Sequence, residues 1–280
     1  MTPPSFQAAS LHVADGVAEF VHQRPRARNP LGSELREDYI RLLDVVEREP
    51  AIRVLILRGE GGFSAGGDVR EMAARLDAPD AHTPETTRRR IAAANAWLER
   101  LLALDALVIA AVDGAAYGGG FSLALHADLV LASPEARFCM SFPRVGAVPD
   151  FGAHYLLPRV VGLGAARGLM LTGRSIGAKA ARRLGIVHAI HPADQLAQRA
   201  RDTARLLCEG PAAALACSKR LLNASHDSGY RALGQLEAQA QGIAMASAYH
   251  HDAARRFRDR QALAFDWDRD ATDLAFDHDD

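Results

Sequence analysis

This sequence has few cysteines, almost no net charge and no long uninterrupted apolar run. Each of these features excludes a class of function. The three cysteines, Cys139, Cys208 and Cys217, have no C-x-x-C or other metal-ligand spacing, which argues against a disulfide framework and a cysteine metal site. We therefore expect a reduced, cytoplasmic protein with no bound metal. A formal net charge of −1 gives no electrostatic footprint for nucleic acid or an anionic membrane, so neither is expected as a partner.

The sequence also lacks a segment that could cross a membrane or direct the chain to one. Its most apolar part, residues 101–132, is interrupted by Asp105, Asp113 and Asp128, whereas a membrane helix needs about 20 consecutive apolar residues. Residues 1–16 have neither the basic nor the apolar region of a signal peptide. Instead, 280 residues with 49% hydrophobic and 24% charged side chains have the balance of one large globular domain with room for a smaller appendage.

Segments of strand and helix length alternate through the first half of the chain. Residues 10–22 alternate apolar and polar side chains around Asp15-Gly16, which predicts a hairpin. The next elements are strands over 52–59, 107–114 and 127–133, with helices over 34–49, 69–76, from 84 onward and after 120. This order predicts an α/β fold with a parallel sheet and right-handed crossovers.

Capping residues mark where two of these helices begin. Asp68 is expected to be the N-cap of the helix that follows it, with Glu71 completing a capping box. Thr83 is expected to cap the long helix that begins at Pro84.

Two glycine-rich turns each follow a predicted parallel strand. The first is "GGFSAGGD" over residues 61–68, and the second contains Gly118-Gly119-Gly120. Both turns then lie at the carboxyl ends of strands, where open α/β sheets bind ligands. Each also precedes a helix, so unpaired N–H groups point into the same crevice. Two such donors form an oxyanion hole.

Other interpretations of these turns are weaker. Residues 62–66 match the G-x-S-x-G pattern of an esterase elbow with Ser64 as nucleophile. However, Ser64 lies about five residues beyond the strand and four before the helix cap, and no histidine is singled out as its partner. The second turn breaks the G-x-G-x-x-G spacing at Leu123, and no phosphate-binding G-x-x-x-x-G-K-[ST] loop is present.

Five segments together resemble the enoyl-CoA hydratase/isomerase (crotonase) superfamily, in order and in spacing. They are "RARNPL", "VLILRGEGGFSAGGDVREM", "AAVDGAAYGGGFSLALHADLVLAS", "VPDFGAHYLLPRVVG" and "LTGRSIGAKAARRLGIVHAI". The resemblance spans roughly residues 10–265. It implies a spiral of ββα units with a helical C-terminal trimerisation region, an acyl-CoA thioester as substrate with no separate cofactor, and a homotrimer or dimer of trimers.

The resemblance also divides the chain into three parts. Residues 1–200 would form the ββα spiral core with the acyl-CoA site, and residues 201–265 a helical oligomerisation region. Beyond residue 162 the pattern is mostly helical, and "IVHAIHP" is its one strand-like run. Residues 266–280 carry seven Asp and one Arg, which predicts a solvated acidic tail. "FRDRQALAF" is expected to reach a neighbouring subunit's CoA site.

By position, the resemblance assigns the oxyanion-hole donors to the N–H groups of Ala65 and Gly119. It assigns substrate contacts to the basic loop that touches CoA and to residues around the two turns. These contacts are Arg24, Arg26, Ala27 and Arg28 in the loop, and Ala65, Gly67, Asp68, Met72, Gly118 and Phe142 around the turns.

The catalytic acids of family hydratases are missing here. Ser122 and Phe142 stand where those enzymes carry two glutamates. Asp150 stands where family isomerases and some dehalogenases carry their functional carboxylate, and apolar neighbours would raise its pKa above the ordinary value of about 3.9. Alternatively, Asp150 caps a helix that starts at Phe151. His154 and Ser122 are possible auxiliary groups.

These observations favour an enoyl-CoA Δ3,Δ2-isomerase with Asp150 as the proton shuttle, because one carboxylate can both accept and donate a proton. The alternatives are a hydratase or lyase of the same family, a dehalogenase-like enzyme with Asp150 as nucleophile, and a non-catalytic acyl-CoA binder. The esterase interpretation is the weakest.

Overall fold

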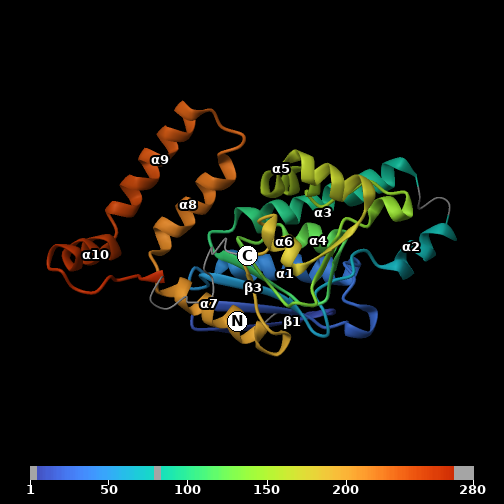
Figure 1. Ribbon diagram of the computed structural model, residues 1–280, viewed down its shortest axis with the longest axis horizontal. Coiled ribbons are helices and arrows are strands. Elements are labelled where there is room, and N and C mark those ends of the chain that lie inside the picture. Colours follow the sequence, from blue (N-terminus) through green and yellow to red (C-terminus); the bar gives the residue numbers. More distant parts are fainter. Residues whose placement is uncertain (1–4, 79–82, 268–280) are drawn as a thin grey trace.

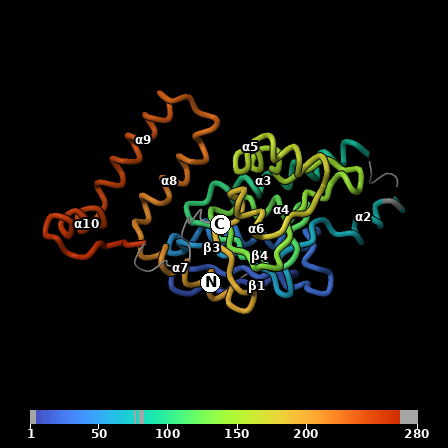
Figure 2. The backbone as a smooth tube through the Cα atoms, in the orientation of Figure 1, coloured from blue at the N-terminus to red at the C-terminus, as the bar shows by residue number. Residues whose placement is uncertain are grey.

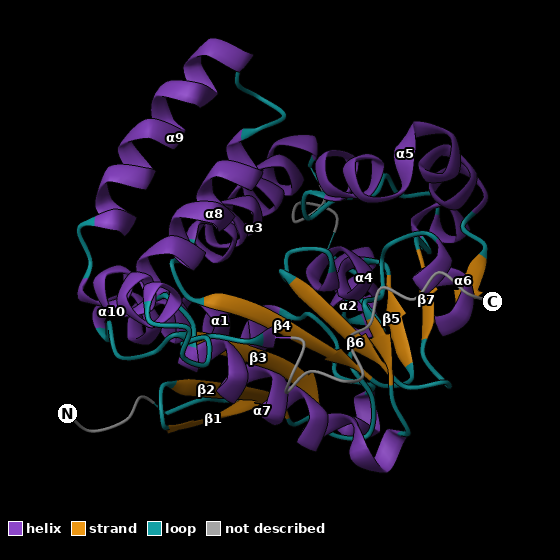
Figure 3. Ribbon diagram, turned by 60° about the vertical axis from the view of Figure 1, so that its left-hand side comes forward, coloured by secondary structure: helices purple, strands orange, loops and turns teal. Residues whose placement is uncertain are grey.

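A six-stranded sheet forms the centre of the protein (Figure 1; Figure 3). The structure is a computed structural model that describes residues 5–78 and 83–267. Strands follow the order β1-β2-β3-β4-β6-β9. Their bounds are β1 Ala9–Ala14, β2 Val17–His22, β3 Val54–Gly59, β4 Leu107–Val112, β6 Leu129–Ala132 and β9 Ala189–Ile190.

The predicted hairpin and parallel sheet are confirmed. β1 and β2 pair antiparallel, and Asp15 and Gly16 both take positive φ, 51° and 79°, at the turn between them. Strands β2, β3, β4, β6 and β9 are parallel. The carboxyl ends of β3 and β4 therefore lie at one edge of the sheet, as the sequence indicated.

A second sheet of three-residue strands was not predicted. It has the order β5-β7-β8, with β5 Ala115–Tyr117, β7 Arg137–Cys139 and β8 Ser175–Gly177. The expectation of a single strand-like run beyond residue 162 is therefore wrong, because β8 precedes β9. Strands this short hold too few residues for a period-2 pattern to emerge.

Helices cover both faces of the larger sheet and extend beyond it. Their bounds are α1 Ser33–Arg48, α2 Val69–Leu76, α3 Pro84–Ala103, α4 Gly119–Ala124, α5 Ala153–Thr172, α6 Ala178–Arg183, α7 Ala193–Glu209, α8 Ala212–Ala224, α9 Tyr230–Met245 and α10 Ala248–Arg258, with short 3₁₀ helices at Pro25–Ala27 and Phe142–Val145. One core lies on the side of α1 and α3. A smaller core packs α7 on the opposite face of the sheet.

The C-terminal helices α8, α9 and α10 project from the core as a separate arm (Figure 1; Figure 2). Tyr230 and Phe257 on this arm are 96% and 77% exposed. The predicted boundary after residue 200 falls inside α7, whose Ala200 and Ala204 are buried against the sheet. The oligomeric state stays a prediction, and residues 268–280 of the predicted acidic tail lie outside the described residues.

Within residues 5–78 and 83–267, no helix combines the length and the apolar character that a membrane span requires.

Lys219 anchors the first helix of the arm to the core. It is only 4% exposed, lies 2.8 Å from an Asp128 carboxylate oxygen and donates to the Ala106 carbonyl at 2.9 Å. Lys219→Met would leave both acceptors without this donor. We expect the free energy of unfolding to fall by about 1–3 kcal/mol, as measured by urea unfolding. Lys179→Met is the matched control, because Lys179 is exposed, and an equal loss in both variants would contradict this account.

Candidate active site

The first glycine turn lies directly beside the start of the second. Ser64 donates its N–H to the Ala115 carbonyl at 2.9 Å, and its own carbonyl accepts from Tyr117 N–H at 3.0 Å. These bonds form an isolated parallel bridge between Ser64 and Ala116. The loop after β3 is therefore hydrogen-bonded to strand β5, and β5 leads into the second turn.

Glycine is required where the turns touch. Gly66 has a φ of +95°, and a Cβ placed on it would lie 2.6 Å from the Tyr117 carbonyl oxygen and 3.6 Å from the Gly119 nitrogen. Gly66 thus lies close to the nitrogen of Gly119, at the start of α4.

The expectation that Ala65 donates its N–H in an oxyanion hole is wrong. Its N–H already donates to the Arg28 carbonyl at 2.9 Å, so this hydrogen is not available to a ligand. Within the described residues, the N–H groups of Gly67 and Gly119 make no hydrogen bond. Gly67 directly precedes Asp68, the N-cap of α2. Its N–H therefore lies outside the helix, and the sequence around it carries no local signal that separates Gly67 from Ala65 as a donor.

Ser64 has a structural role in this turn. Its hydroxyl is buried and donates to the Asn29 carbonyl at 2.7 Å, and within the described residues it makes no hydrogen bond to a histidine. Asn29 in turn donates to the Gly62 carbonyl at 2.6 Å. The basic loop and the first turn therefore form one unit, and the nucleophile interpretation of Ser64 is not supported.

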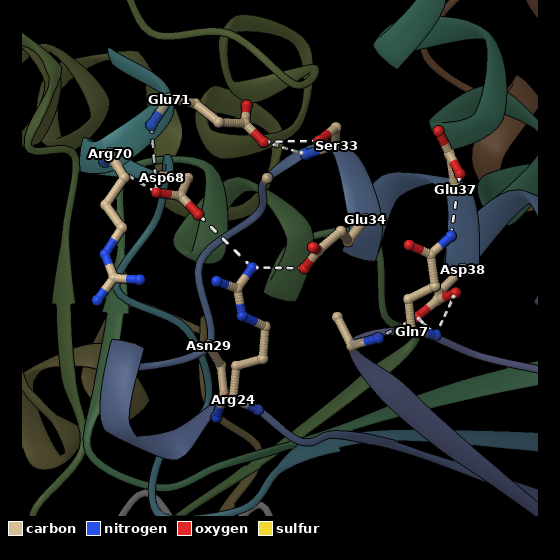
Figure 4. A network of polar contacts seen from close by, with 12 residues as sticks. Gln7, Arg24, Asn29, Ser33, Glu34, Glu37, Asp38, Asp68, Arg70 and Glu71 are labelled. Carbon is tan, nitrogen blue, oxygen red and sulfur yellow. Dashed lines mark hydrogen bonds and ion pairs between the residues drawn. The ribbon is translucent and has the colours of Figure 1, made fainter. Parts of the chain in front are cut away.

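The three loop arginines differ in their contacts. The Arg24 guanidinium lies 2.8 Å from a carboxylate oxygen of Glu34 and 3.6 Å from one of Asp68. Its charge is therefore already paired with acidic side chains (Figure 4). Arg26 and Arg28 are exposed and have no ion pair in the part of the chain that the structure describes. Of the predicted CoA contacts, these two have their positive charge available for phosphate, with Ala27 between them in the 3₁₀ helix.

The predicted helix cap of α2 is confirmed, but the capping box is not. The Asp68 carboxylate accepts from the N–H groups of Arg70 and Glu71. The side chain of Glu71 does not return to Asp68 and instead accepts from Ser33 N and Oγ at 2.6 and 2.7 Å (Figure 4). Glu71 thereby joins α2 to the start of α1.

Asp150 does not cap a helix. Helix α5 begins at Ala153, and its N-cap is Gly152. The Asp150 Oδ1 is buried and has no hydrogen-bond partner within the described residues. Burial raises the pKa of Asp150 to about 6, against the attraction of Arg90 and Arg36. The turn thus holds a carboxyl group whose proton can come and go near neutral pH.

Neither Ser122 nor Phe142 supplies a second acid beside Asp150. Ser122 is fully buried, and its hydroxyl donates to the Asp150 backbone carbonyl at 3.1 Å, which ties the carboxylate turn to α4. The ring of Phe142 would lie 3.8 Å from a Cβ on Gly118. Position 142 therefore presents an apolar surface to the second turn.

Of the remaining predicted residues, Met72 borders the site, whereas His154 makes no hydrogen bond to Asp150 in the part of the chain that the structure describes. A Cβ on Gly67 would lie 2.6 Å from the Met72 methyl carbon, so Met72 borders the first turn as expected. A Cβ on Gly119 would touch Leu31 and the ring of Phe151. His154 is exposed and, within the described residues, makes no hydrogen bond to Asp150, so its auxiliary role stays a prediction.

Comparison with known proteins agrees with this arrangement. A family model described as enoyl-CoA hydratase/isomerase matches residues 12–268. The chain belongs to the enoyl-CoA hydratase/isomerase family.

Relatives with different activities share this family. The chain is 33% identical to the 1,2-epoxyphenylacetyl-CoA isomerase of Escherichia coli (strain K12), over 91% of this chain and 96% of that protein. It is 30% identical to the short-chain-enoyl-CoA hydratase of Clostridium acetobutylicum, over 88% and 93% of the two chains. The crystal structure of an enoyl-CoA hydratase/isomerase from Cupriavidus metallidurans CH34 has a TM-score of 0.87 at 38% identity, covering 94% of this chain and 97% of that one.

A row of buried rings connects the two halves of the site in this family member. His22 Nδ1 lies 3.0 Å from the Phe63 carbonyl, and Nε2 lies 2.7 Å from the Tyr39 hydroxyl. Burial lowers the pKa of His22 to about 4, although the bond to Phe63 opposes this. A carbonyl can only accept, so Nδ1 carries the proton and Nε2 accepts from Tyr39. The Tyr39 ring stacks on Trp97 with 4.8 Å between ring centroids, and Trp97 packs edge-on against Phe151 with 6.1 Å between centroids.

Arg36 and Arg90 are site neighbours that the sequence did not indicate. Arg36 is a half-buried residue in the first turns of α1, and Arg90 lies near the start of α3. Both attract the Asp150 carboxylate. They are far from Asp150 in the sequence and belong to no motif, so only the packed fold reveals them.

A glycine-to-alanine substitution, which adds one methyl group, tests the close contact between the two glycine turns. We expect Gly66→Ala to lower the free energy of unfolding by about 1–3 kcal/mol more than Gly146→Ala, because its Cβ overlaps the Tyr117 carbonyl. Gly146 has a φ of +67° with nothing within 4 Å of a Cβ placed on it. Gly146→Ala therefore measures only the cost of a side chain at positive φ, without a steric overlap. Equal losses in urea unfolding would contradict the close approach of the turns.

Proposed function

We propose that the protein is an enoyl-CoA Δ3,Δ2-isomerase in which Asp150 moves the proton. The observation that carries this proposal is the Asp150 carboxyl group, whose Oδ1 is buried and has no hydrogen-bond partner within the described residues, beside a turn with an unbonded N–H. Ser122 connects the backbone of Asp150 to α4, and Phe151 lies against Gly119.

The reaction follows from these groups. The thioester oxygen of a 3-enoyl-CoA accepts hydrogen bonds from Gly67 and Gly119 N–H. Asp150 removes a proton from C2, and the electron pair moves onto the thioester oxygen to give a dienolate. The two donors stabilise this charge without reorganising, since they are fixed in the backbone. Asp150 then returns the proton to C4, which leaves the double bond between C2 and C3.

A hydratase is the second candidate, because the chain is 30% identical over 249 residues to a protein named short-chain-enoyl-CoA hydratase. Adding water requires a base for the water and an acid for C2. The positions that would supply glutamates hold Ser122, which is occupied with the Asp150 carbonyl, and Phe142. One carboxyl group suffices for a proton shift, and this favours the isomerase.

Asp150→Asn tests the proton shuttle. We expect turnover of a 3-enoyl-CoA to fall by about 10²–10⁴-fold, because an amide cannot take up the C2 proton. The assay follows conversion of 3-enoyl-CoA and 2-enoyl-CoA in D2O, with deuterium incorporation as a second readout. Rapid formation of 3-hydroxyacyl-CoA by the wild type would contradict the isomerase assignment. Binding of both esters without turnover in the wild type would favour the acyl-CoA binder.

The raised pKa of Asp150 sets the pH dependence. The carboxylate must be ionised to act as a base, so kcat/KM for the 3-enoyl ester should decline as the pH falls through about 6. Stability should change in the opposite sense, because the folded protein holds this proton more tightly than the unfolded chain. The wild type should lose stability relative to Asp150→Asn as the pH rises from about 4 to about 6. A flat kcat/KM profile between pH 5 and 7 would rule out Asp150 as the base.

A further inference from the structure

A buried histidine, His126, lies between helix α4 and the turn that carries Asp150. It directly follows Leu125, the C-cap of α4, and is only 4% exposed. Its Nδ1 lies 2.9 Å from the Ser122 carbonyl oxygen. Because a carbonyl can only accept, Nδ1 carries the proton. Burial lowers the pKa of His126 to about 4, although the bond to Ser122 opposes this, so the ring is neutral near pH 7.

The same serine holds the Asp150 turn with its side chain. The Ser122 hydroxyl donates to the Asp150 carbonyl at 3.1 Å, and the Gly118 carbonyl is a more distant acceptor at 3.4 Å. The Asp150 carbonyl also accepts from Ala153 N–H at 3.2 Å. Ser122 therefore has His126 on its backbone oxygen and the Asp150 turn on its hydroxyl.

His126 also lies directly against this turn. Phe151 and Gly152 have φ angles of 55° and 70°, so two successive residues take the left-handed conformation. A Cβ on Gly152 would lie 3.3 Å from both Cε1 and Nε2 of His126, and the edge of the ring thus faces the Gly152 backbone. A bulky residue such as Phe151 is uncommon at positive φ, so contacts from neighbouring elements must hold the turn in place.

We propose that His126 is a positioning residue for Asp150, because it holds the turn at 150–152 against α4 through Ser122 and Gly152. This role rests on the proposed isomerase function and adds a residue to its site. The last carbonyls of a helix lack intrahelical partners, and His126 satisfies one of them as a capping side chain. The Ser122 hydroxyl and the Gly152 contact extend the cap to the turn. Since a displacement of about 1 Å in an active site can cost 10²-fold in rate, the role should be visible in catalysis as well as in stability.

Two variants at this position separate the hydrogen bond from the bulk of the ring. His126→Leu removes the donor to Ser122, whereas His126→Asn places an amide N–H where Nδ1 was. In His126→Leu we expect kcat for a 3-enoyl-CoA to fall about 10–100-fold, with KM changed less than about threefold. His126→Asn should keep kcat within about threefold of the wild type. His188→Leu is the matched control, because His188 also bonds the backbone, at Val130 N–H at 3.0 Å, but on strand β6.

The pH profile gives a readout that a merely structural histidine would not move. Burial raises the pKa of Asp150 to about 6, and a loosened turn in His126→Leu would admit water and bring that pKa back toward its ordinary value. Arg36 and Arg90, which oppose the rise, are unchanged in the variant. The acid limb of kcat/KM should therefore move to lower pH in His126→Leu and stay in place in His188→Leu.

Two results would refute the positioning role. One is an unchanged kcat in His126→Leu. The other is an equal loss in His126→Leu and His126→Asn while the acid limb stays in place, which would make His126 a core residue only.

Gly152→Ala decides the matter if His126→Leu does not fold. It is compared in the wild type and in the His126→Asn background. The backbone cost at a φ of +70° is the same in both, whereas the overlap with Cε1 and Nε2 exists only with the histidine. The loss in kcat should be at least about threefold smaller in the His126→Asn background. An equal loss in both backgrounds overturns the contact.

A failure of the proposed function is recognised separately. If the wild type isomerises no 3-enoyl-CoA, the isomerase assignment fails, and the positioning role is measured without substrate. An NMR titration of the Asp150 carboxyl group, assigned with Asp150→Asn, then compares the wild type with His126→Leu, or with Gly152→Ala if His126→Leu does not fold. A midpoint that moves to lower pH in the variant supports the role of His126, and an unmoved midpoint overturns it.

Discussion

Ser64 exchanges backbone hydrogen bonds with strand β5, and this short pairing brings together two turns that are distant in the sequence. Because the bridge joins the loop after β3 to the middle of β5, it holds Gly66 close to Gly119. The buried hydroxyl of Ser64 and the side chain of Asn29 then lock the basic loop onto the same unit. The donors and the loop assigned to CoA are therefore positioned by one set of contacts.

The carboxylate half of the site is held by different means. Phe151 has a φ of +55°, an uncommon conformation for a bulky residue, and Trp97 packs edge-on against its ring. The ring row from His22 through Tyr39 and Trp97 links this turn to the Phe63 carbonyl at the start of the donor loop. Core packing thus sets the separation between the glycine turns and Asp150, and a shift of even about 1 Å in an active site can cost 10²-fold in rate.

The sequence predicted the elements of the larger sheet and the part of the chain that carries the site. It did so because glycines, a proline and capping residues leave local signals, as at Gly16, Asp68 and Pro84. It failed where the answer depends on partners distant in the chain. The resemblance assigns Ala65 as a donor, but its N–H is bonded to the Arg28 carbonyl of a distant loop. The alternative that Asp150 caps a helix fails for a local reason, because Gly152 is the N-cap of α5.

A crystal structure of the protein with a saturated, unreactive acyl-CoA such as hexanoyl-CoA would test the central claim most directly. The account predicts the thioester oxygen within about 2.7–3.2 Å of both Gly67 N and Gly119 N, with the Asp150 carboxyl group facing C2 and C4 of the acyl chain. A thioester oxygen bound by any other pair of groups, or an Asp150 side chain turned away from the acyl chain, would contradict it.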